Sequence, residues 1–413
     1  GKTIMERIWL KHYPAGVPAD IDVTQYSSLV ELLEESFKKF ADRKAFICMD
    51  KAITYRELDE LSNQGAHLFR SLGLKAGDHI ALLMENRLAF MEICWAAQRS
   101  GLYYTAISRY LTEEEIAYII KDCGAKVFIT TPQCADKVKG LIKGEPGEPL
   151  FYMMDEPAAG FRSYDKEAAA QPTTPVADEV AGYDMLYSSG TTGRPKGIVR
   201  PLPEQPPSQN LPLFDFLTKL WHYREGMVYL SPAPLYHSAP QAAVNLTIRM
   251  GGTVVIMESF DPERYLALVE KWGITHSQLV PTMFSRLLKL PEQVRTRYDL
   301  STLEIAIHAA APCPALVKDD MIKWWGPIIH EYYGATEGLG FTACNSEEWL
   351  AHRGTVGRVL LGDLHILDEN MQPCPKGTPG TVWFKTATPF EYFNDPAKTS
   401  EARSADGSMS TVG

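Results

Sequence analysis

The sequence predicts an α/β fold: two tandem doubly wound α/β subdomains, followed by a small antiparallel, β-barrel-like subdomain. Apolar runs typical of buried strands alternate with helical segments twice along the 413 residues, the pattern of parallel sheets covered by helices on both faces. From about Gly354 this alternation gives way to short strands separated by Gly, Pro and Asp-Glu-Asn turns, as in an antiparallel unit. We therefore expect subdomains over approximately 1–175, 176–345 and 346–413.

The first unit begins with an amphipathic helix. The segment "SLVELLEESFKKF" starts at Ser28 and places its leucines and phenylalanines on one face, and Ser28 with Glu31 has the spacing of a capping box. The same start signal recurs at the pairs Thr54/Glu57 and Thr112/Glu115. Buried strands are expected between these helices at 79–84, 103–107 and 126–130.

The second and third units are predicted from further apolar runs. In the second unit, strands are expected at 183–187, 227–230, 253–257, 276–280, 304–309 and 328–333. In the third unit, they are expected at 356–361, 364–368 and 380–385. The Pro-rich stretch 201–212 is short and is interpreted as a surface loop.

Composition limits the classes of function. Hydrophobic content of 45% and charged content of 22% are typical of a globular protein, and a net charge of -10 counts against non-specific nucleic-acid binding. The seven cysteines form no CxxC pair and no zinc spacing, which favours reduced structural thiols. No run reaches the ~18 apolar residues of a membrane-spanning helix. The opening "GKTIMERIWL" lacks a signal-peptide core, so we expect a cytoplasmic location.

The stretch "YSSGTTGRPKG" (187–197) follows an apolar run and suits a phosphate group. Glycine permits close approach, and successive backbone N–H dipoles form a nest for an anion. Lys196 adds a positive charge, whereas the Walker A pattern fails because Pro195 precedes the lysine and Gly197 follows it. For a loop of this composition, the alternative is a flexible surface turn. The candidate phosphate-binding residues are Ser188, Ser189, Gly190, Thr191, Thr192, Gly193 and Lys196.

Five motifs in a fixed order resemble the adenylate-forming superfamily of acyl-CoA synthetases, luciferases and adenylation domains. They are "SSGTTGRPKG" (188–197), "APLYHSAP" (233–240), "HAAAPCP" (308–314), "EYYGATEG" (331–338) and "GTVGR" (354–358). The resemblance implies the N-terminal-domain fold of that superfamily. It also implies ATP-dependent conversion of a carboxylic acid to an acyl-adenylate with release of pyrophosphate, followed by transfer to CoA. The stretches "SPAPLYHSAP" and "PTMFSRLLKLP" are similar to bacterial enzymes of the fatty-acid type.

The resemblance assigns a role to each candidate residue around the phosphates. Attack of a carboxylate on the α-phosphorus of ATP brings two anions together, so their charge must be neutralised. The family pattern places Ser188 to Thr192 and Lys196 at the phosphates, Thr336 at the α-phosphate and Glu337 on Mg²⁺, a hard cation that prefers oxygen ligands. By itself, Glu337 would be interpreted as a solvated loop carboxylate.

The remaining candidates are residues expected to contact the adenine ring of ATP or the carboxylic-acid substrate. The resemblance places the ring of Tyr333 against adenine. Other residues of this slot are Ala310, Ala311, Glu331, Tyr332 and Gly334. His237 stands between the acyl pocket and the nucleotide, where it would orient the carboxylate or gate the pocket; a structural histidine is the alternative. The catalytic candidates are therefore Lys196, His237, Thr336 and Glu337.

Several alternatives stay open. Aryl, bile-type and carnitine-like acids are compatible with the motifs, whereas an amino-acid substrate is disfavoured because "LYHSAP" offers no carboxylate to pair with a buried ammonium. A hypothesis of another class is a catalytically silent nucleotide-binding or scaffold module. A homodimer and peripheral contact with a membrane surface are both left open.

The end of the sequence departs from the family pattern. The chain stops at "DGSMSTVG", before the ribose-binding aspartate, the hinge and the small mobile C-terminal domain that the resemblance implies. We therefore expect an N-terminal domain without its mobile domain and with impaired catalysis.

Overall fold

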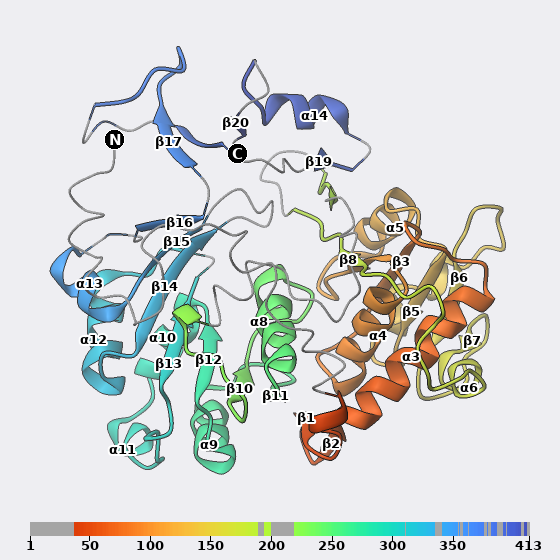
Figure 1. Ribbon diagram of the computed structural model, residues 1–413, viewed down its shortest axis with the longest axis horizontal. Coiled ribbons are helices and arrows are strands. Elements are labelled where there is room, and N and C mark those ends of the chain that lie inside the picture. Colours follow the sequence, from red (N-terminus) through yellow and green to blue (C-terminus); the bar gives the residue numbers. More distant parts are fainter. Residues whose placement is uncertain are drawn as a thin grey trace.

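The computed structural model describes residues 37–188, 194–199, 219–309, 311–334, 341–353, 355, 358–361, 363–375, 378, 381–385, 391–393, 395–405 and 409–410. Two large sheets lie side by side, and short strands with one helix lie across one end of them (Figure 1). The helix predicted from Ser28 falls outside the described residues except for its last positions, of which 37–39 are helical. No helix within the described ranges is long and apolar enough to cross a membrane.

The first sheet is six-stranded and fully parallel, in the order β7-β6-β5-β3-β4-β8. Its strands are β3 (His79–Leu83), β4 (Tyr103–Ala106), β5 (Val127–Thr130), β6 (Leu150–Met153), β7 (Arg162–Ser163) and β8 (Tyr183–Asp184). The associated helices are α3 (Tyr55–Ser71), α4 (Leu88–Arg99), α5 (Glu113–Asp122) and α6 (Tyr164–Ala169), with short 3₁₀ turns at Ala135–Lys137 and Lys139–Leu141.

Alternate residues of the central strand β3 face opposite layers, as a doubly wound sheet requires. Ile80 and Leu82 belong to the hydrophobic cluster that contains α3 and α4. Ala81 and Leu83 belong to a second cluster, which contains α5. The predicted helix starts are confirmed, since the Thr54/Glu57 and Thr112/Glu115 capping boxes both form.

The second sheet is nine-stranded, in the order β16-β15-β14-β13-β12-β10-β11-β1-β2. Its strands are β1 (Lys44–Cys48), β2 (Lys51–Thr54), β10 (Val228–Ser231), β11 (Thr253–Ile256), β12 (His276–Leu279), β13 (Ile305–His308), β14 (Ile329–Gly334), β15 (Phe341–Cys344) and β16 (Arg358–Leu361). The central strands are parallel, and antiparallel strands β2, β15 and β16 flank them. Its helices are α8 (Ser238–Arg249), α9 (Pro262–Trp272), α10 (Pro281–Leu288), α11 (Glu292–Arg295), α12 (Ala315–Trp325) and α13 (Ser346–Ala351).

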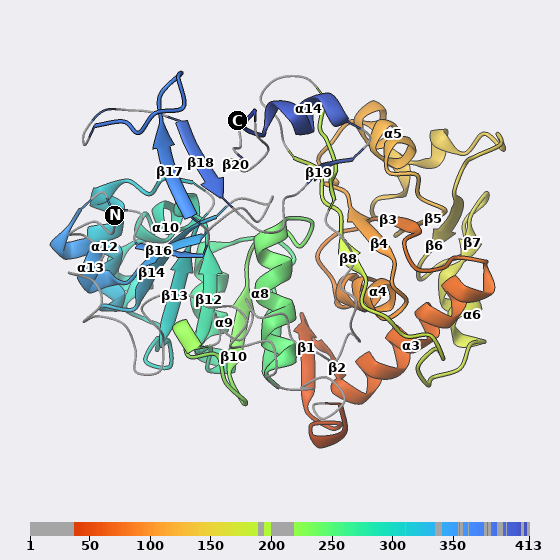
Figure 2. The ribbon, with the colours of Figure 1, turned by 45° about the horizontal axis from the view of Figure 1, so that its top comes forward.

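This sheet joins segments that are far apart in the sequence. Strand β1 pairs in parallel with β11, so the beginning of the described chain completes the second sheet rather than the first. Helices α9, α10 and α12 pack on one face of this sheet, and α8 packs on the other, between the two sheets (Figure 2). The subdomain limits expected near 175 and 345 stay a prediction.

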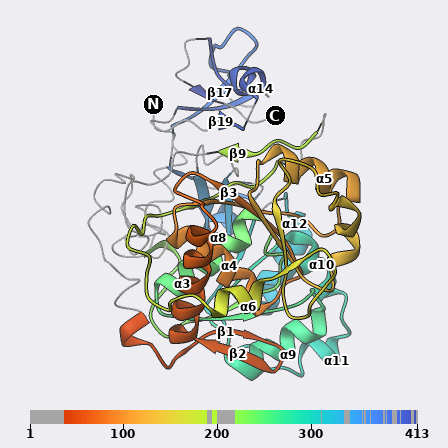
Figure 3. The ribbon, with the colours of Figure 1, turned by 90° about the vertical axis from the view of Figure 1, so that its right-hand side faces the viewer.

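The last described elements form an antiparallel three-stranded sheet, β17-β18-β20, and a strand pair, β19-β9. These elements are β9 (Ile198–Val199), β17 (Asp363–Leu367), β18 (Thr381–Lys385), β19 (Glu391–Tyr392), α14 (Pro396–Glu401) and β20 (Met409–Ser410). They lie above the two large sheets in Figure 3. Because β9 immediately follows the predicted phosphate loop, its pairing with β19 joins that loop to this last part of the chain.

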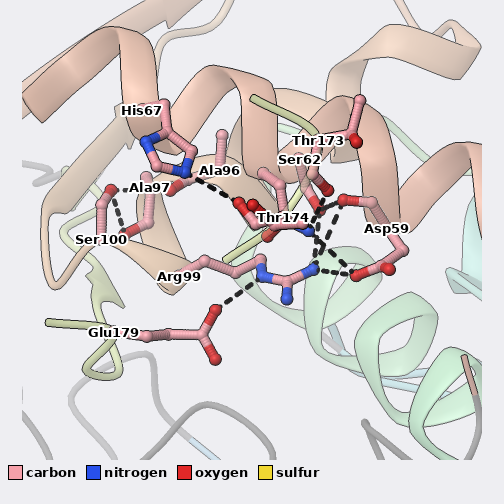
Figure 4. Close-up of polar contacts among 11 residues, drawn as sticks. Asp59, Ser62, His67, Ala96, Ala97, Arg99, Ser100, Thr173, Thr174 and Glu179 are labelled. Carbon is pink, nitrogen blue, oxygen red and sulfur yellow. Dashed lines mark hydrogen bonds and ion pairs between the residues drawn. The ribbon is translucent and has the colours of Figure 1, made fainter. Parts of the chain in front are cut away.

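The segment between α6 and β8 is hydrogen-bonded to α3 and α4 (Figure 4). His67 Nε2 lies 2.8 Å from the carbonyl oxygen of Thr174. The buried guanidinium of Arg99 donates to Glu179 at 2.9 Å and also binds Asp59. These contacts hold the segment that leads through β8 to the predicted phosphate loop.

Gly182, just before β8, passes too close to neighbouring backbone for any side chain. An added Cβ would lie 2.3 Å from the carbonyl oxygen of Leu102 and 2.6 Å from that of Ala97. We expect Gly182→Ala to lower the free energy of unfolding by about 1–3 kcal/mol, as overpacking does. Gly140→Ala is the matched control, because a Cβ there meets nothing within 4 Å. Equal urea-unfolding midpoints for the two variants would contradict the close approach.

Candidate active site

The two stems of the predicted phosphate loop are hydrogen-bonded to each other. The backbone N–H of Ser188 donates to the carbonyl of Lys196 at 2.8 Å, and that of Ile198 donates to Leu186 at 3.0 Å. Tyr187 and Gly197 form an antiparallel bridge between them. The candidates Ser189 to Gly193, between the stems, lie outside the described residues. Ser188 has a buried Oγ without a partner among the described residues, and this hydroxyl is chemically suited to a phosphate oxygen.

Helix α5 holds both stems. Tyr118 and Asp122 are four residues apart, so they lie on the same face of the helix. The hydroxyl of Tyr187 donates to Asp122 Oδ2 at 2.7 Å, and the hydroxyl of Tyr118 donates to the carbonyl of Pro195 at 3.2 Å. The guanidinium of Arg194 lies over the Tyr118 ring, 4.8 Å from its centroid.

Lys196 is held as a cation at the base of this loop. Its Nζ lies 3.2 Å from Asp395 Oδ2 and 3.5 Å from the Tyr118 hydroxyl. Burial by itself would lower the pKa of Lys196, but the hydrogen bonds to Asp395 and Tyr118 outweigh it and raise that pKa above its ordinary value. Lys196 is therefore a cation at neutral pH, and its partner in this structure is the Asp395 carboxylate.

Sequence reasoning missed Asp395. Its side chain caps α14 by accepting from the N–H of Lys398, and this bond, with a smaller contribution from Lys196, lowers the pKa of Asp395. An aspartate directly before Pro396 is a readable helix-start signal. No sequence signal links that helix start to Lys196, because the pairing depends on β9 meeting β19.

His237 is the residue immediately before α8. It lies in the connection from β10, and its ring centroid is 4.4 Å from that of Tyr236. Burial of the imidazole lowers the pKa of His237, although the residue as a whole is exposed at the helix start. The neutral imidazole, which has one donor N–H and one acceptor nitrogen, is thus favoured at neutral pH.

Glu331 on β14 is tied to a buried lysine. Lys318 on α12 is 1% exposed, and its Nζ lies 2.6 Å from Glu331 Oε2. His308, at the end of β13, is fully buried with its Nε2 3.7 Å from the same oxygen. Burial, with a smaller contribution from the Lys318 charge, lowers the pKa of His308 to about 3. The neutral imidazole leaves Lys318 as the charge partner of Glu331.

Tyr332 points to the opposite face of β14 from Glu331, because neighbouring strand residues alternate. Its hydroxyl accepts a hydrogen bond from Gln278 Nε2 at 2.9 Å, and its ring lies 5.5 Å from that of Trp221. Burial raises the pKa of Tyr332 to about 12. The described side chains therefore do not bring Glu331 and Tyr332 together in one slot.

The other candidates are only partly described. Ala311 is exposed in the connection between β13 and α12. For Tyr333 and Gly334 the structure gives the strand backbone, in which both pair with β15. Ala310, Thr336 and Glu337 lie outside the described residues. In the ranges that are described, no group of three His, Cys, Asp or Glu side chains is placed to hold a metal ion.

Strand direction places several candidates along one edge. Strands β10, β12, β13 and β14 run parallel, so their carboxyl ends share the edge at which open α/β sheets bind ligands. His237 follows β10, Ala311 follows β13, and Gly334 ends β14. His237, Ala311 and Gly334 therefore lie along the same edge of the sheet.

Comparison with known proteins gives one family. A family model described as "AMP-binding enzyme" matches residues 33–392. A long-chain-fatty-acid–CoA ligase of Yersinia pestis is 27% identical over 416 residues, covering 92% of this chain and 73% of the relative. A 4-coumarate–CoA ligase 5 of Oryza sativa subsp. japonica is 28% identical over 398 residues, covering 91% and 71%.

Solved structures share the fold. The anthranilate CoA ligase AuaEII in complex with anthranoyl-AMP superposes with a TM-score of 0.80 at 20% identity, covering 95% of this chain and 76% of that one. ATP-bound MatB from Rhodopseudomonas palustris gives 0.75 at 25% identity, covering 93% and 76%. The family match extends over most of the chain and includes both phosphate-loop stems, His237 and β14. The chain belongs to the AMP-binding enzyme family.

Proposed function

We propose that this chain is an AMP-forming acid–CoA ligase, which activates a carboxylic acid with ATP, releases pyrophosphate and transfers the acyl group to CoA. The observation that carries the proposal is that the two hydrogen-bonded stems bring Lys196 and the Ser188 hydroxyl, which is unpartnered within the described ranges, to the same end of the predicted phosphate loop. Family membership and relatives named as CoA ligases support the same reaction.

Different side chains of the protein have separate roles in acid activation. Lys196 balances phosphate charge, and the Ser188 hydroxyl donates to a phosphate oxygen. His237 in its neutral form hydrogen-bonds the acid and orients it toward the nucleotide. The adenine ring of ATP binds near the carboxyl ends of β13 and β14, beside Ala311 and Gly334.

A magnesium ion is part of this proposal. Glu337 supplies the carboxylate oxygen that Mg²⁺ prefers, and the ion characteristically takes few protein carboxylates together with substrate phosphates. When bound, it neutralises charge on the phosphate oxygens. The metal role of Glu337, a cytoplasmic location and a homodimer stay predictions.

The substrate class we propose is a fatty acid. Ligases for long-chain fatty acids from Yersinia pestis and Escherichia coli are 27% identical to this chain. This identity does not separate a fatty acid from an aryl acid, so aryl acids stay the alternative substrate class. The motif 233–240 contains no acidic residue, so an amino-acid ammonium would lack a partner there.

The test is pyrophosphate release from ATP and Mg²⁺ with a panel of acids. We expect dodecanoate and hexadecanoate to be activated, with each buried CH₂ adding up to ~0.8 kcal/mol of affinity until the pocket ends. We also expect 3-phenylpropanoate to be preferred to phenylalanine, its amino analogue. Preference for the zwitterion would contradict the proposed substrate class. ATP binding without pyrophosphate release from any acid would favour the silent nucleotide-binding module.

A further inference from the structure

One buried amide joins the six-stranded sheet to the acid-pocket motif. Asn86 follows β3 and is 8% exposed. Its Nδ2 donates to the carbonyl oxygens of Ala233 and Met257, each at 3.0 Å. Its Oδ1 accepts from the backbone N–H of Leu235 at 2.9 Å. The side chain thus uses both N–H groups and its oxygen on backbone that belongs to the nine-stranded sheet and the loop after it.

The backbone groups that Asn86 binds lie at the start of the acid-pocket motif and beside it. Ala233 and Leu235 lie in the connection from β10 to α8, and Met257 follows β11, the neighbour of β10. Leu235 is fully buried, and His237 follows it by two residues. The N–H of His237 in turn donates to the carbonyl of Pro234 at 3.2 Å. The path from Asn86 to the His237 imidazole therefore runs through a short, hydrogen-bonded stretch of backbone.

These three hydrogen bonds require a side-chain amide, and the side chain must have the length of asparagine. Buried backbone groups must be paired, and Asn86 pairs two carbonyls and one N–H that lie on two different segments. An aspartate keeps the acceptor for Leu235 but turns lone pairs toward both carbonyl oxygens. An alanine leaves all three backbone groups without these bonds.

We propose that Asn86 is a positioning residue for the acid site, acting through the 233–237 backbone on His237. This inference rests on the proposed acid-activating function. Asn86 is buried and its polar atoms are all engaged, so it contacts no reactant itself. Reacting groups must be held closely, and a displacement of about 1 Å far from the chemistry costs about 10²-fold in rate. Loss of the amide should therefore affect the acid and leave ATP binding intact.

The experiment compares Asn86→Ala and Asn86→Asp with Asn63→Ala. Asn63 is the matched control, because it is also a buried amide and its Nδ2 donates to the Thr173 carbonyl at 2.8 Å, in the segment held by α3. We expect all three variants to lose stability. Only the Asn86 variants should raise the KM for dodecanoate, by about tenfold or more, while the KM for ATP stays unchanged.

Amide hydrogen exchange gives a readout independent of turnover. The N–H of Leu235 should exchange faster in Asn86→Ala and stay protected in Asn63→Ala, since Asn86 Oδ1 is its acceptor. Unchanged protection at Leu235, or a parallel rise of both KM values, would overturn the positioning role. If wild-type protein activates no acid, the proposed function fails while the exchange arm still decides whether Asn86 fixes the loop.

Discussion

Replacing Lys318 with methionine is expected to lower the free energy of unfolding by about 3–5 kcal/mol, the usual result of removing one partner of a buried ion pair. Lys318 is 1% exposed and Glu331 is 12% exposed, so water does little to replace the lost charge. Methionine keeps the apolar stem, which makes the change largely electrostatic. The Lys318 ammonium also lies 4.9 Å from the centroid of the Trp349 ring, a favourable contact that is lost as well.

Urea unfolding of two further variants isolates the buried charge. In Lys318→Met/Glu331→Gln no carboxylate is left unpaired, so most of the lost stability should return. Lys126→Met is the surface control, because Lys126 is 54% exposed beside Asp78, and exposed pairs contribute only about 0–1 kcal/mol. A loss in Lys318→Met no larger than in Lys126→Met would contradict the buried pair.

Replacing Lys196 with alanine is expected to slow acyl-adenylate formation by about 10²–10³-fold, the magnitude lost with one preorganised charge-stabilising donor. The phosphate-loop stems are held by α5 through Tyr118 and Asp122 independently of the Lys196 side chain, so the fold should persist. Pyrophosphate release with the best acid of the panel, together with calorimetric titration of ATP, measures the effect.

Asp395→Asn is the matched control for Lys196→Ala. It removes the carboxylate that faces Lys196 at 3.2 Å without removing the cation, so the ATP affinity should stay the same or increase. Circular dichroism checks that both variants stay folded. Unchanged ATP affinity and turnover in Lys196→Ala would show that the loop lysine does not serve the phosphates.

The motifs and the local start signals could be predicted from the sequence. The capping boxes at Thr54 and Thr112 depend on residues three positions apart, and both form as predicted. The alternation of apolar runs predicts parallel sheets with helices on both faces, and β3 to β5 follow it closely. Family membership follows from short motifs whose chemistry is carried by contiguous residues.

Long-range pairing decided the rest of the fold. The hairpin β1–β2 lies in the nine-stranded sheet because β1 pairs with β11. The sequence of an apolar strand does not specify which strand it pairs with. Strand β16, expected in the third unit, adds instead to the edge of the same sheet through β15. Such contacts depend on packing over the whole domain, which local propensity does not encode.

The sequence by itself determined that this chain carries a Gly/Ser/Thr loop with Lys196, the "APLYHSAP" motif with His237, and a Tyr-Gly pair at the end of an apolar run. Only the tertiary structure showed that Lys196 faces Asp395, that Lys318 pairs with Glu331, and that Asn86 hydrogen-bonds the backbone before His237. The physical reason is that burial makes a polar group depend on whichever partner the fold brings within about 3 Å, and that partner is distant in sequence.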